Sequence, residues 1–277
     1  RNKKILITGG LGFIGSNLAH KCVKLGAHVT IFDNLNPRAG GNLFNISDIR
    51  SKIQLSIGDI LDFQHLCQSV IEQDIIFNCA ASTSHPYSMR EPLIDIDIND
   101  KGVIHILEAL RRFNKHAKFV QIGTTTQLGT LLYKPADENH PEFPKDVYSA
   151  NKSASEKYTL IYGQSYGIPI TVIRLPNVFG PRATINSSEF TFCNFFIGLV
   201  LQKKEITIYG EGRQLRNIIY IDDCVDALVC VALSENSNGE VFFAVSDYHC
   251  SVNDFATATI QTFNSGSIRY IPWPKER

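Results

Sequence analysis

The chain has 277 residues, of which 44% are hydrophobic and 19% charged, an ordinary composition for a globular protein of one large or two small domains. Lys plus Arg (27) equal Asp plus Glu (27), so the sequence lacks the basic excess that would hold a nucleic acid. No stretch reaches the roughly 18 apolar residues of a membrane span. The first apolar run, Ile5 to Ile7, is too short for a signal peptide.

Up to residue 175, short β-branched runs alternate with longer amphipathic stretches. We predict strands at 4–8, 27–33, 53–57, 74–79, 118–123 and 170–175. We predict helices at 13–25, 62–72, 93–112 and 147–166. This alternation, with continuous apolar strands, predicts an α/β fold with a parallel, doubly wound sheet.

The pattern changes after Pro176. There we expect helices near 189–203, 223–233 and 252–263, and short strands at 206–209 and 241–245. We therefore divide the chain into a Rossmann domain, residues 1–176, and a mainly substrate-binding part, residues 177–277. Some segments of the second part are expected to return to the sheet.

The seven cysteines are scattered, with no C-x-x-C pair and no metal-type cluster. Their odd number and spacing predict reduced thiols, a reducing compartment and a cytoplasmic protein. The adjacent carboxylates of Asp222 and Asp223 point in different directions and no His joins them, so we expect them at a helix N-terminus. No metal site is predicted.

A glycine-rich run, TGGLGFIG at 8–15, joins the first strand to the first helix. Glycines permit a tight turn and a close approach of the backbone to a pyrophosphate, which the N–H groups and the positive dipole end of the helix attract. The alternative is a plain glycine turn, which the strand–turn–helix context disfavours. The expected phosphate-binding residues are Gly9, Gly12, Phe13, Ile14 and Gly15.

Two carboxylates follow the second and third strands. Asp33 would accept hydrogen bonds from the adenosine ribose and repel a 2′-phosphate, which favours NAD over NADP. The alternative is a strand-end turn residue before Asn34. Asp59, before Ile60, would meet the adenine, or it is a helix cap or turn residue.

Tyr148 and Lys152 lie at i and i+4 of a helix for which Asp146 is the expected N-cap. A free tyrosine has a pKa of about 10, and a nearby ammonium lowers it by stabilising the phenolate. The pair is therefore a proton-transfer device, although such pairs also occur on solvated helices.

The order of TGGLGFIG, FDN, GDI, NCAAS, YSANK and RLPNVFGPR resembles the extended short-chain dehydrogenase/reductase family, and most closely its nucleotide-sugar epimerases and dehydratases. The match runs from Lys4 to about Val245. It implies an NAD-dependent enzyme with a nucleotide-sugar substrate. The residues then expected at the cofactor are Gly9, Gly12, Phe13, Ile14, Gly15, Asp33, Asn34, Asp59, Ile60, Ala80, Tyr148 and Lys152.

The resemblance also implies the other roles. Thr124, aligned on Gly129, takes the place of the strand-end Ser or Thr that binds the reacting hydroxyl, so the catalytic set is Thr124, Tyr148 and Lys152. The substrate-binding set is Ser88, Thr124, Thr125, Asn177, Arg182 and Arg216, with Asn177 and Arg216 at the diphosphate. The structural alternatives are a helix cap for Ser88, a β-branched strand residue for Thr125 and Thr126, and a solvated loop for the two arginines. His85 is assigned to loop packing. Asn99 lies at a family position on the next helix, with a polar group in helix packing as the alternative.

Two departures from the family pattern make the assignment to one subgroup less specific. The sequence has Gln127-Leu128 where Val-Tyr is usual, and Asn78 where His is usual. Dehydratases of this family carry Asp-Glu after the strand-end threonine, and here those positions are Thr125 and Thr126. We therefore predict an epimerase that oxidises a sugar hydroxyl, with Tyr148 as base and NAD as hydride carrier, and re-reduces the keto sugar from its other face. The alternatives are a 4,6-dehydratase or decarboxylase, and, remotely, a non-enzymatic NAD sensor. The helices at 93–112 and 147–166 resemble those that pair in family dimers, so a homodimer is expected.

Overall fold

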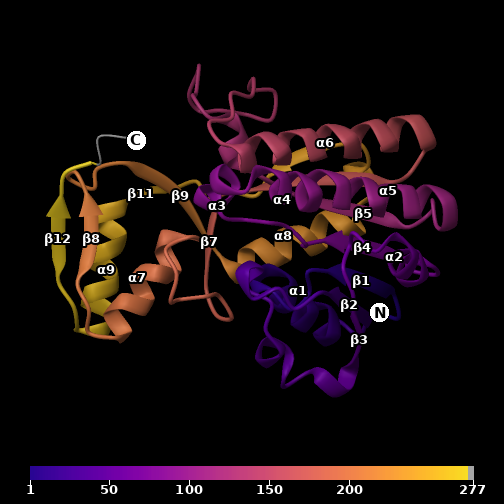
Figure 1. The fold of residues 1–277 in the computed structure, drawn as a ribbon, viewed down its shortest axis with the longest axis horizontal. Coiled ribbons are helices and arrows are strands. Elements are labelled where there is room, and N and C mark those ends of the chain that lie inside the picture. Colours follow the sequence, from indigo (N-terminus) through magenta and orange to yellow (C-terminus); the bar gives the residue numbers. More distant parts are fainter. Residues whose placement is uncertain (274–277) are drawn as a thin grey trace.

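In the computed structural model, which describes residues 1–273, a seven-stranded parallel sheet forms the larger lobe (Figure 1). Its strands, in spatial order, are β10 (Val241–Phe243), β6 (Ile170–Leu175), β5 (Lys118–Thr124), β4 (Ile75–Asn78), β1 (Lys4–Thr8), β2 (His28–Asp33) and β3 (Ile53–Ile57). The order 3-2-1-4-5-6 is that of a Rossmann fold, so the predicted fold class is confirmed.

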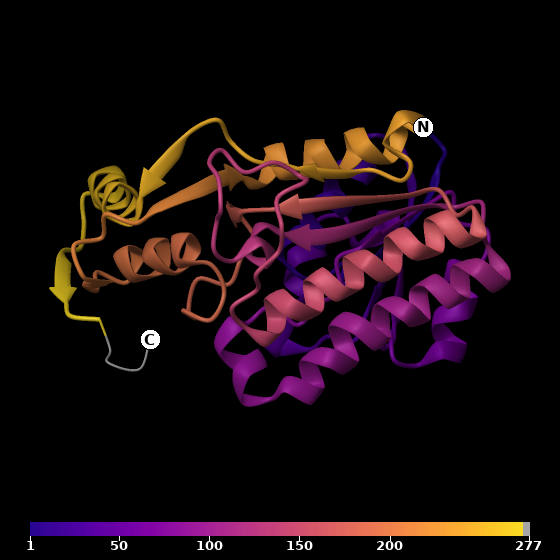
Figure 2. The same cartoon turned by 90° about the horizontal axis from the view of Figure 1, so that it is seen from above.

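Helices cover both faces of this sheet (Figures 1 and 2). The helices of the described residues are α1 (Phe13–Lys24), α2 (Phe63–Val70), α3 (His85–Arg90), α4 (Pro92–Ile96), α5 (Gly102–Phe113), α6 (Val147–Tyr166), α7 (Phe192–Leu201), α8 (Ile221–Leu233) and α9 (Val252–Phe263), of which α7 and α9 belong to the smaller lobe. Alternate residues of β1 point to opposite faces. Ile5 and Ile7 pack with α1 and α8, while Leu6 packs with α2 and α5.

The smaller lobe is built from α7, α9 and two short sheets (Figure 1). Its strands are β7 (Asn177–Phe179), β9 (Leu215–Tyr220) and β11 (His249–Ser251) in one sheet, and β8 (Ile206–Tyr209) with β12 (Ile268–Ile271) in the other. Phe196, Ile208 and Ala256 are buried in its core. The chain beyond Pro176 also supplies α8 and β10 to the layers of the large sheet.

Several predicted boundaries were wrong. The expected helix at 93–112 is interrupted by a π-helical turn, Asp97–Lys101. There the buried amide of Asn99 donates to the carbonyl oxygen of Ser82 and to the carboxylate Oδ1 of Asp95, at 2.9 Å each, and its Oδ1 accepts the Ser82 N–H. The helix expected from 189 begins only at Phe192. Strands β7, β9, β11 and β12 were missed.

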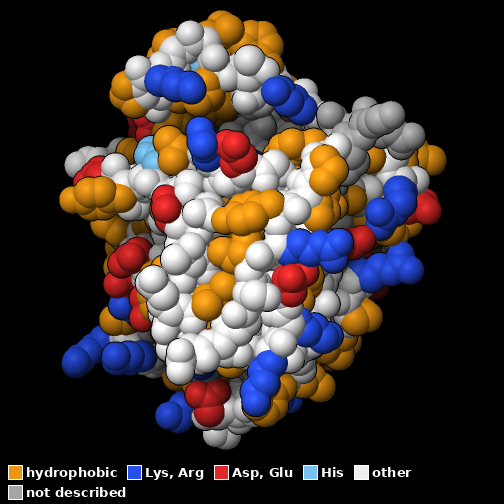
Figure 3. Space-filling model, turned by 90° about the vertical axis from the view of Figure 1, so that its left-hand side faces the viewer, with side chains coloured by type: hydrophobic (Ala, Val, Ile, Leu, Met, Phe, Trp, Pro, Cys, Tyr) orange, Lys and Arg blue, Asp and Glu red, His pale blue; other side chains and the backbone are white. Residues whose placement is uncertain are grey.

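Asp222 and Asp223 lie in the first turn of α8, as predicted. Within residues 1–273, no helix combines the length and the apolar character that crossing a membrane requires. On the face of the molecule in Figure 3, basic and acidic side chains are interspersed rather than gathered in one patch, in keeping with the balanced charge.

Candidate active site

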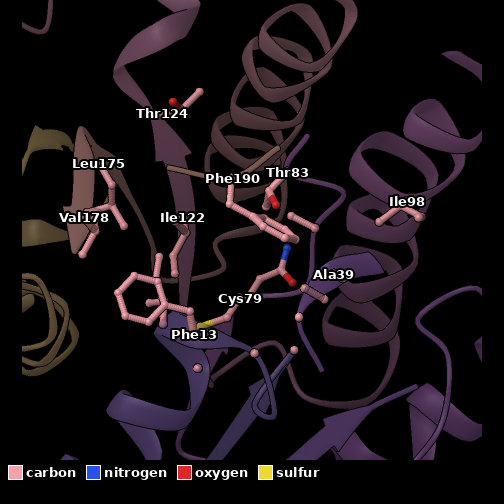
Figure 4. Close-up of a pocket in the computed structure, with 18 of the residues that line it drawn as sticks. Phe13, Ala39, Cys79, Thr83, Ile98, Ile122, Thr124, Leu175, Val178 and Phe190 are labelled. Carbon is pink, nitrogen blue, oxygen red and sulfur yellow. The ribbon is translucent and has the colours of Figure 1, made fainter. Parts of the chain in front are cut away.

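A pocket opens at the carboxyl ends of strands β1, β2, β4, β5 and β6, where parallel sheets of this kind bind ligands (Figure 4). Residues of the smaller lobe complete its wall, among them Asn177, Val178 and Phe190. All of the residues expected at the cofactor line this one pocket, and so do Thr124, Thr125 and Asn177.

The glycine-rich loop has the geometry that close approach to a phosphate requires. Gly9 has a φ of +67°, and a Cβ atom there would lie 2.6 Å from the backbone nitrogen of Ala80. A Cβ atom on Gly15 would overlap the carbonyl oxygen of Gly9. Helix α1 has Gly12 as its N-cap and no side-chain cap, so its first N–H groups are available at the pocket.

Asp33 is held with both carboxylate oxygens on backbone donors. Its Oδ2 accepts the N–H of Leu11 at 3.0 Å, and its Oδ1 accepts the N–H of Leu35 at 2.8 Å. Burial raises the pKa of this carboxyl group, and the two backbone bonds oppose that rise. Its rigid position at the pocket fits the recognition of ribose hydroxyls.

Asp59 serves both as a turn residue and as part of the pocket wall. Its Oδ1 accepts the N–H of Leu61 at 2.9 Å, and its Oδ2 accepts the side chain of Asn34 at 2.8 Å. Asp59 is therefore a turn residue through its Oδ1, as the alternative prediction stated. The hydrogen bond from Asn34 to its Oδ2 joins the two loops that would enclose an adenosine.

Tyr148, on the first turn of α6, is 9% exposed, and Thr124 at the end of β5 lies beside it. Burial raises the pKa of Tyr148 above its usual value, the charge of Asp95 adds to this, and a side-chain hydrogen bond with Thr124 opposes it. The expected lowering by Lys152 is not seen. The Lys152 ammonium group donates to the carbonyl oxygen of Ile122 at 2.5 Å.

Lys152 is buried, and burial lowers its pKa to about 8, against the charges of Asp95 and Asp100. Asp95 is fully buried, and one oxygen of each carboxylate has no hydrogen-bond partner. Burial and the neighbouring Asp95 raise the pKa of Asp100 to about 6. The charges of these two acids therefore favour the ammonium form of Lys152, and the sequence analysis missed them.

Three hydroxyl groups lie in a row beside Tyr148. Thr124 Oγ1 and Thr126 Oγ1 are 3.0 Å apart, and Ser149 Oγ donates to Thr126 Oγ1 at 2.9 Å. Thr126 and Ser149 were not expected at the site. Their signal was present in the sequence, because Thr126 lies two residues beyond Thr124 and Ser149 directly follows the tyrosine.

Histidine 85 lines the pocket, contrary to the prediction that it packs in a loop. Its Nδ1 is 2.8 Å from Oδ2 of Asp146, and its ring meets that of Tyr148 edge-on with centroids 4.7 Å apart. Asp146 also caps α6, as predicted, by accepting the N–H of Ser149. No spacing rule in the sequence connects residues 85 and 146.

The structure does not bring three of the expected substrate residues to the pocket wall. Ser88 is fully buried; its Oγ accepts the backbone N–H of Tyr148 at 3.0 Å and donates to the carbonyl oxygen of His85. Arg182 donates to Asn17 Oδ1 at 2.8 Å and to the carbonyl oxygen of Asn45. Arg216 is exposed on β9, where its guanidinium bonds the Leu215 carbonyl oxygen.

A family model described as the NAD dependent epimerase/dehydratase family matches residues 5–244. The chain belongs to this family. The predictions of the family and of NAD as cofactor are thereby confirmed. Among the residues described, no group of three or more His, Cys, Asp and Glu side chains is placed to hold a metal ion.

Relatives of different activity are about equally similar to the chain. A putative UDP-glucose 4-epimerase of Methanocaldococcus jannaschii is 31% identical over 228 residues, which cover 80% of this chain and 71% of that protein. UDP-N-acetyl-alpha-D-glucosaminuronate decarboxylase of Bacillus cytotoxicus is 30% identical over 277 residues, covering 99% and 84%. A solved structure, UDP-N-acetylglucosamine 4-epimerase from Methanobrevibacter ruminantium M1 in complex with UDP-N-acetylmuramic acid, matches with a TM-score of 0.93 at 27% identity, covering 100% and 87%. The family thus groups nucleotide-sugar epimerases, dehydratases and decarboxylases, and membership alone does not select one reaction.

The two departures from the family pattern have structural explanations. Gln127 donates to Glu156 Oε2 at 2.9 Å, and Glu156 is paired with the buried Arg174. The turn after Thr124 is thus tied to helix α6 through a buried ion pair. Asn78 accepts a hydrogen bond from the Thr8 hydroxyl at 2.6 Å and donates to Gln121 at 2.9 Å. Neither departure removes a group from the pocket wall.

The pocket has further apolar lining that the sequence analysis missed. Cys79 lies near Ile122, next to Phe13, which was expected at the cofactor, and Phe190 lies beside Thr83 (Figure 4). Cys79 directly follows β4, and that position at the carboxyl end of a parallel strand was a usable signal. Phe190 lies in the loop before α7, and the sequence of that loop contains no signal that it would line the pocket.

Proposed function

We propose that the chain is an NAD-dependent nucleotide-sugar epimerase that inverts one sugar carbon, C4, by transient oxidation. The uncapped N-terminus of α1 and the crowded glycines suit a pyrophosphate, and Asp33 suits an unphosphorylated adenosine ribose. Bound NAD would accept a hydride from the sugar carbon and later return it. The expected cofactor residues that line the pocket would hold it.

Side chains of the chain itself remove the proton of the sugar hydroxyl and bind the sugar oxygen. Tyr148 Oη takes the proton of the sugar hydroxyl, and the Thr124 hydroxyl holds the same sugar oxygen while its charge changes. Lys152, whose ammonium is fixed on the Ile122 carbonyl oxygen, places a positive charge at the base of the pocket. Asn177 and Thr125, both on the pocket wall, are the proposed contacts to the nucleotide sugar.

One observation favours epimerisation over dehydration. The first two residues of the turn after Thr124 are Thr125 and Thr126, which carry hydroxyl groups and no carboxylate, and both line the pocket. Elimination of water from a keto sugar needs one group to remove the C5 proton and another to protonate the leaving hydroxyl. A threonine has no acid–base pKa in the accessible range, so neither residue readily does this. Oxidation should therefore be followed by re-reduction.

Incubation with a panel of UDP- and dTDP-sugars in deuterated water, followed by mass and stereochemical analysis, tests this. An epimer of unchanged mass is the expected product. A product lighter by one water, or with deuterium at C6, would assign a dehydratase. Loss of carbon dioxide from a uronic acid would assign a decarboxylase.

A further inference from the structure

His85, the first residue of α3, is held beside the proposed base by contacts with α6. Its Nδ1 lies 2.8 Å from Oδ2 of Asp146, and its ring meets that of Tyr148 edge-on, with centroids 4.7 Å apart. Its backbone carbonyl oxygen accepts the hydroxyl of Ser88, and this hydroxyl also accepts the N–H of Tyr148. The position of the imidazole relative to Tyr148 is therefore fixed by side-chain and backbone contacts alike.

The second ring nitrogen of His85 is available to a ligand. Among residues 1–273, none forms a hydrogen bond with its Nε2, and 39% of the side chain is exposed. His85 lines the same pocket as Thr124 and Tyr148. Burial tends to raise the pKa of Asp146, but hydrogen bonds from His85 and from the Ser149 N–H lower it below its usual value. Asp146 is therefore the ionised acceptor, Nδ1 carries the hydrogen that it accepts, and Nε2 remains for a bound molecule.

The charges around Nε2 do not suit an anion. Because Asp146 is ionised, the His85–Asp146 pair has no net positive charge in either protonation state of the imidazole. In the part of the chain that the structure describes, Lys152 is the one lysine or arginine that lines the pocket, and its ammonium donates to the Ile122 carbonyl oxygen. A sugar carboxylate would therefore approach Asp146 without a cation to pair with, which is unfavourable. A hydroxyl group can donate to Nε2 or accept from it, so it suits both states of the ring.

We propose that His85 is a specificity-determining residue whose Nε2 binds a sugar hydroxyl next to the one that Tyr148 deprotonates, so that the site selects an uncharged sugar over a uronic acid. The inference rests on the proposed function, because that function places the reacting hydroxyl at Tyr148 and Thr124. The contact is a hydrogen bond in the substrate complex, and no proton is transferred through it. If the reacting hydroxyl is at C4, the neighbouring hydroxyl groups are those at C3 and C6.

A first experiment measures binding and needs no turnover. Calorimetry on the NAD-loaded protein compares UDP-glucose, UDP-glucuronic acid and UDP, or the dTDP series if that binds more tightly. The wild type should bind the glucose compound at least about 10-fold more tightly than the glucuronic acid compound. His85→Phe keeps an aromatic ring against Tyr148 but removes Nε2. It should bind the glucose compound about 10-fold more weakly and the bare nucleotide unchanged, because one hydrogen bond to the sugar is lost.

Two further variants make this comparison specific. Asp146→Asn can still accept the Ser149 N–H and cap α6, but it removes the negative charge behind His85. It should therefore narrow the difference between the glucose and glucuronic acid compounds. His20→Phe is the matched control, because His20 also pairs with an aspartate, Asp48 at 2.7 Å, but lies outside the pocket wall. This control should leave all three affinities unchanged.

A second experiment identifies the hydroxyl that His85 binds. The 3-deoxy and 6-deoxy forms of the accepted nucleotide sugar are compared with the parent compound by steady-state kinetics. For the wild type, kcat/KM should fall about 10-fold with one of the two analogues. In His85→Phe, this analogue and the parent should react equally well, because the partner of the hydroxyl is already absent. The loss in His85→Phe should appear in KM, with kcat nearly unchanged.

The proposal is overturned if the wild type prefers the glucuronic acid compound, if His85→Phe binds the glucose compound as tightly as the wild type, or if it weakens the bare nucleotide equally. A loss confined to kcat would also overturn it, since His85 would then position Tyr148 rather than bind the sugar. If no nucleotide sugar is turned over, the proposed function fails, while the calorimetry still decides whether His85 contacts the sugar.

Discussion

Replacing Asp100 with Asn should stabilise the protein at neutral pH. Asp100 lies in the π-helical turn, and its Oδ1 is buried without a hydrogen-bond partner. Burial and the neighbouring Asp95 carboxylate raise its pKa from 3.8 to about 6. An uncharged amide of nearly the same size removes the cost of placing two anions near each other.

The sign and magnitude follow from proton linkage. Between about pH 4 and pH 6 the unfolded chain has released the Asp100 proton while the folded protein still binds it, so the stability of the wild type falls as pH rises through this window. A shift of about 2 pH units corresponds to about 3 kcal/mol. Asp100→Asn should therefore gain up to about 3 kcal/mol at pH 7 to 8 and almost nothing at pH 4.

Urea unfolding of both proteins at several pH values measures this difference. Asp97→Asn is the matched control, because Asp97 lies in the same turn but is exposed, with Lys101 at 3.8 Å. The Asp97→Asn variant should show no comparable pH-dependent gain in the free energy of unfolding. If Asp100→Asn is less stable than wild type at pH 8, or gains equally at all pH values, Asp100 is not a strained anion. Because Asp100 also raises the pKa of Lys152, the stabilised variant should lose activity at neutral pH.

Other predictions test the cofactor, the base and the assembly. Tyr148→Phe should bind NAD normally in calorimetry but form NADH at least about 100-fold more slowly, and a rate within about a factor of two of wild type would remove Tyr148 from catalysis. Asp33→Asn should narrow the preference for NAD over NADP, and equal binding of both cofactors by the wild type would contradict the role of Asp33. Helices α5 and α6 lie side by side (Figure 2), and α6 exposes 53% of Ile161, so we expect a homodimer. Light scattering that shows a monomer at micromolar concentration would refute it.

The sheet could be predicted from the sequence because its strands are buried on both faces and separated by long helices. The run KILIT became β1 with four of its five residues buried, and ITVIRL became β6 with all six buried. Strand β9, LRNIIY, has one buried residue and mixes polar with apolar side chains, so neither a period of two nor a continuous apolar run identifies it. Short strands of the smaller lobe depend on neighbours that are remote in sequence.

The cofactor side of the pocket was predictable for a related reason. Its residues follow strands directly, and the carboxyl ends of parallel strands meet at one edge of the sheet. Gly9, Asp33 and Thr124 therefore come together wherever the sheet forms. The contact between His85 and Asp146 had no such rule, since it depends on how α3 packs against the start of α6.

Ser88 shows why agreement with a family pattern does not by itself identify a ligand contact. Helix α6 must place Tyr148 at the pocket, and its first N–H groups lack partners within the helix. Ser88 Oγ accepts the N–H of Tyr148, while Asp146 accepts that of Ser149. Ser88 also donates to the carbonyl oxygen of His85, so one buried hydroxyl joins the histidine segment to the catalytic helix. Because Ser88 contacts the backbone of both residues without lining the pocket, its effect on the chemistry is exerted through Tyr148 and His85.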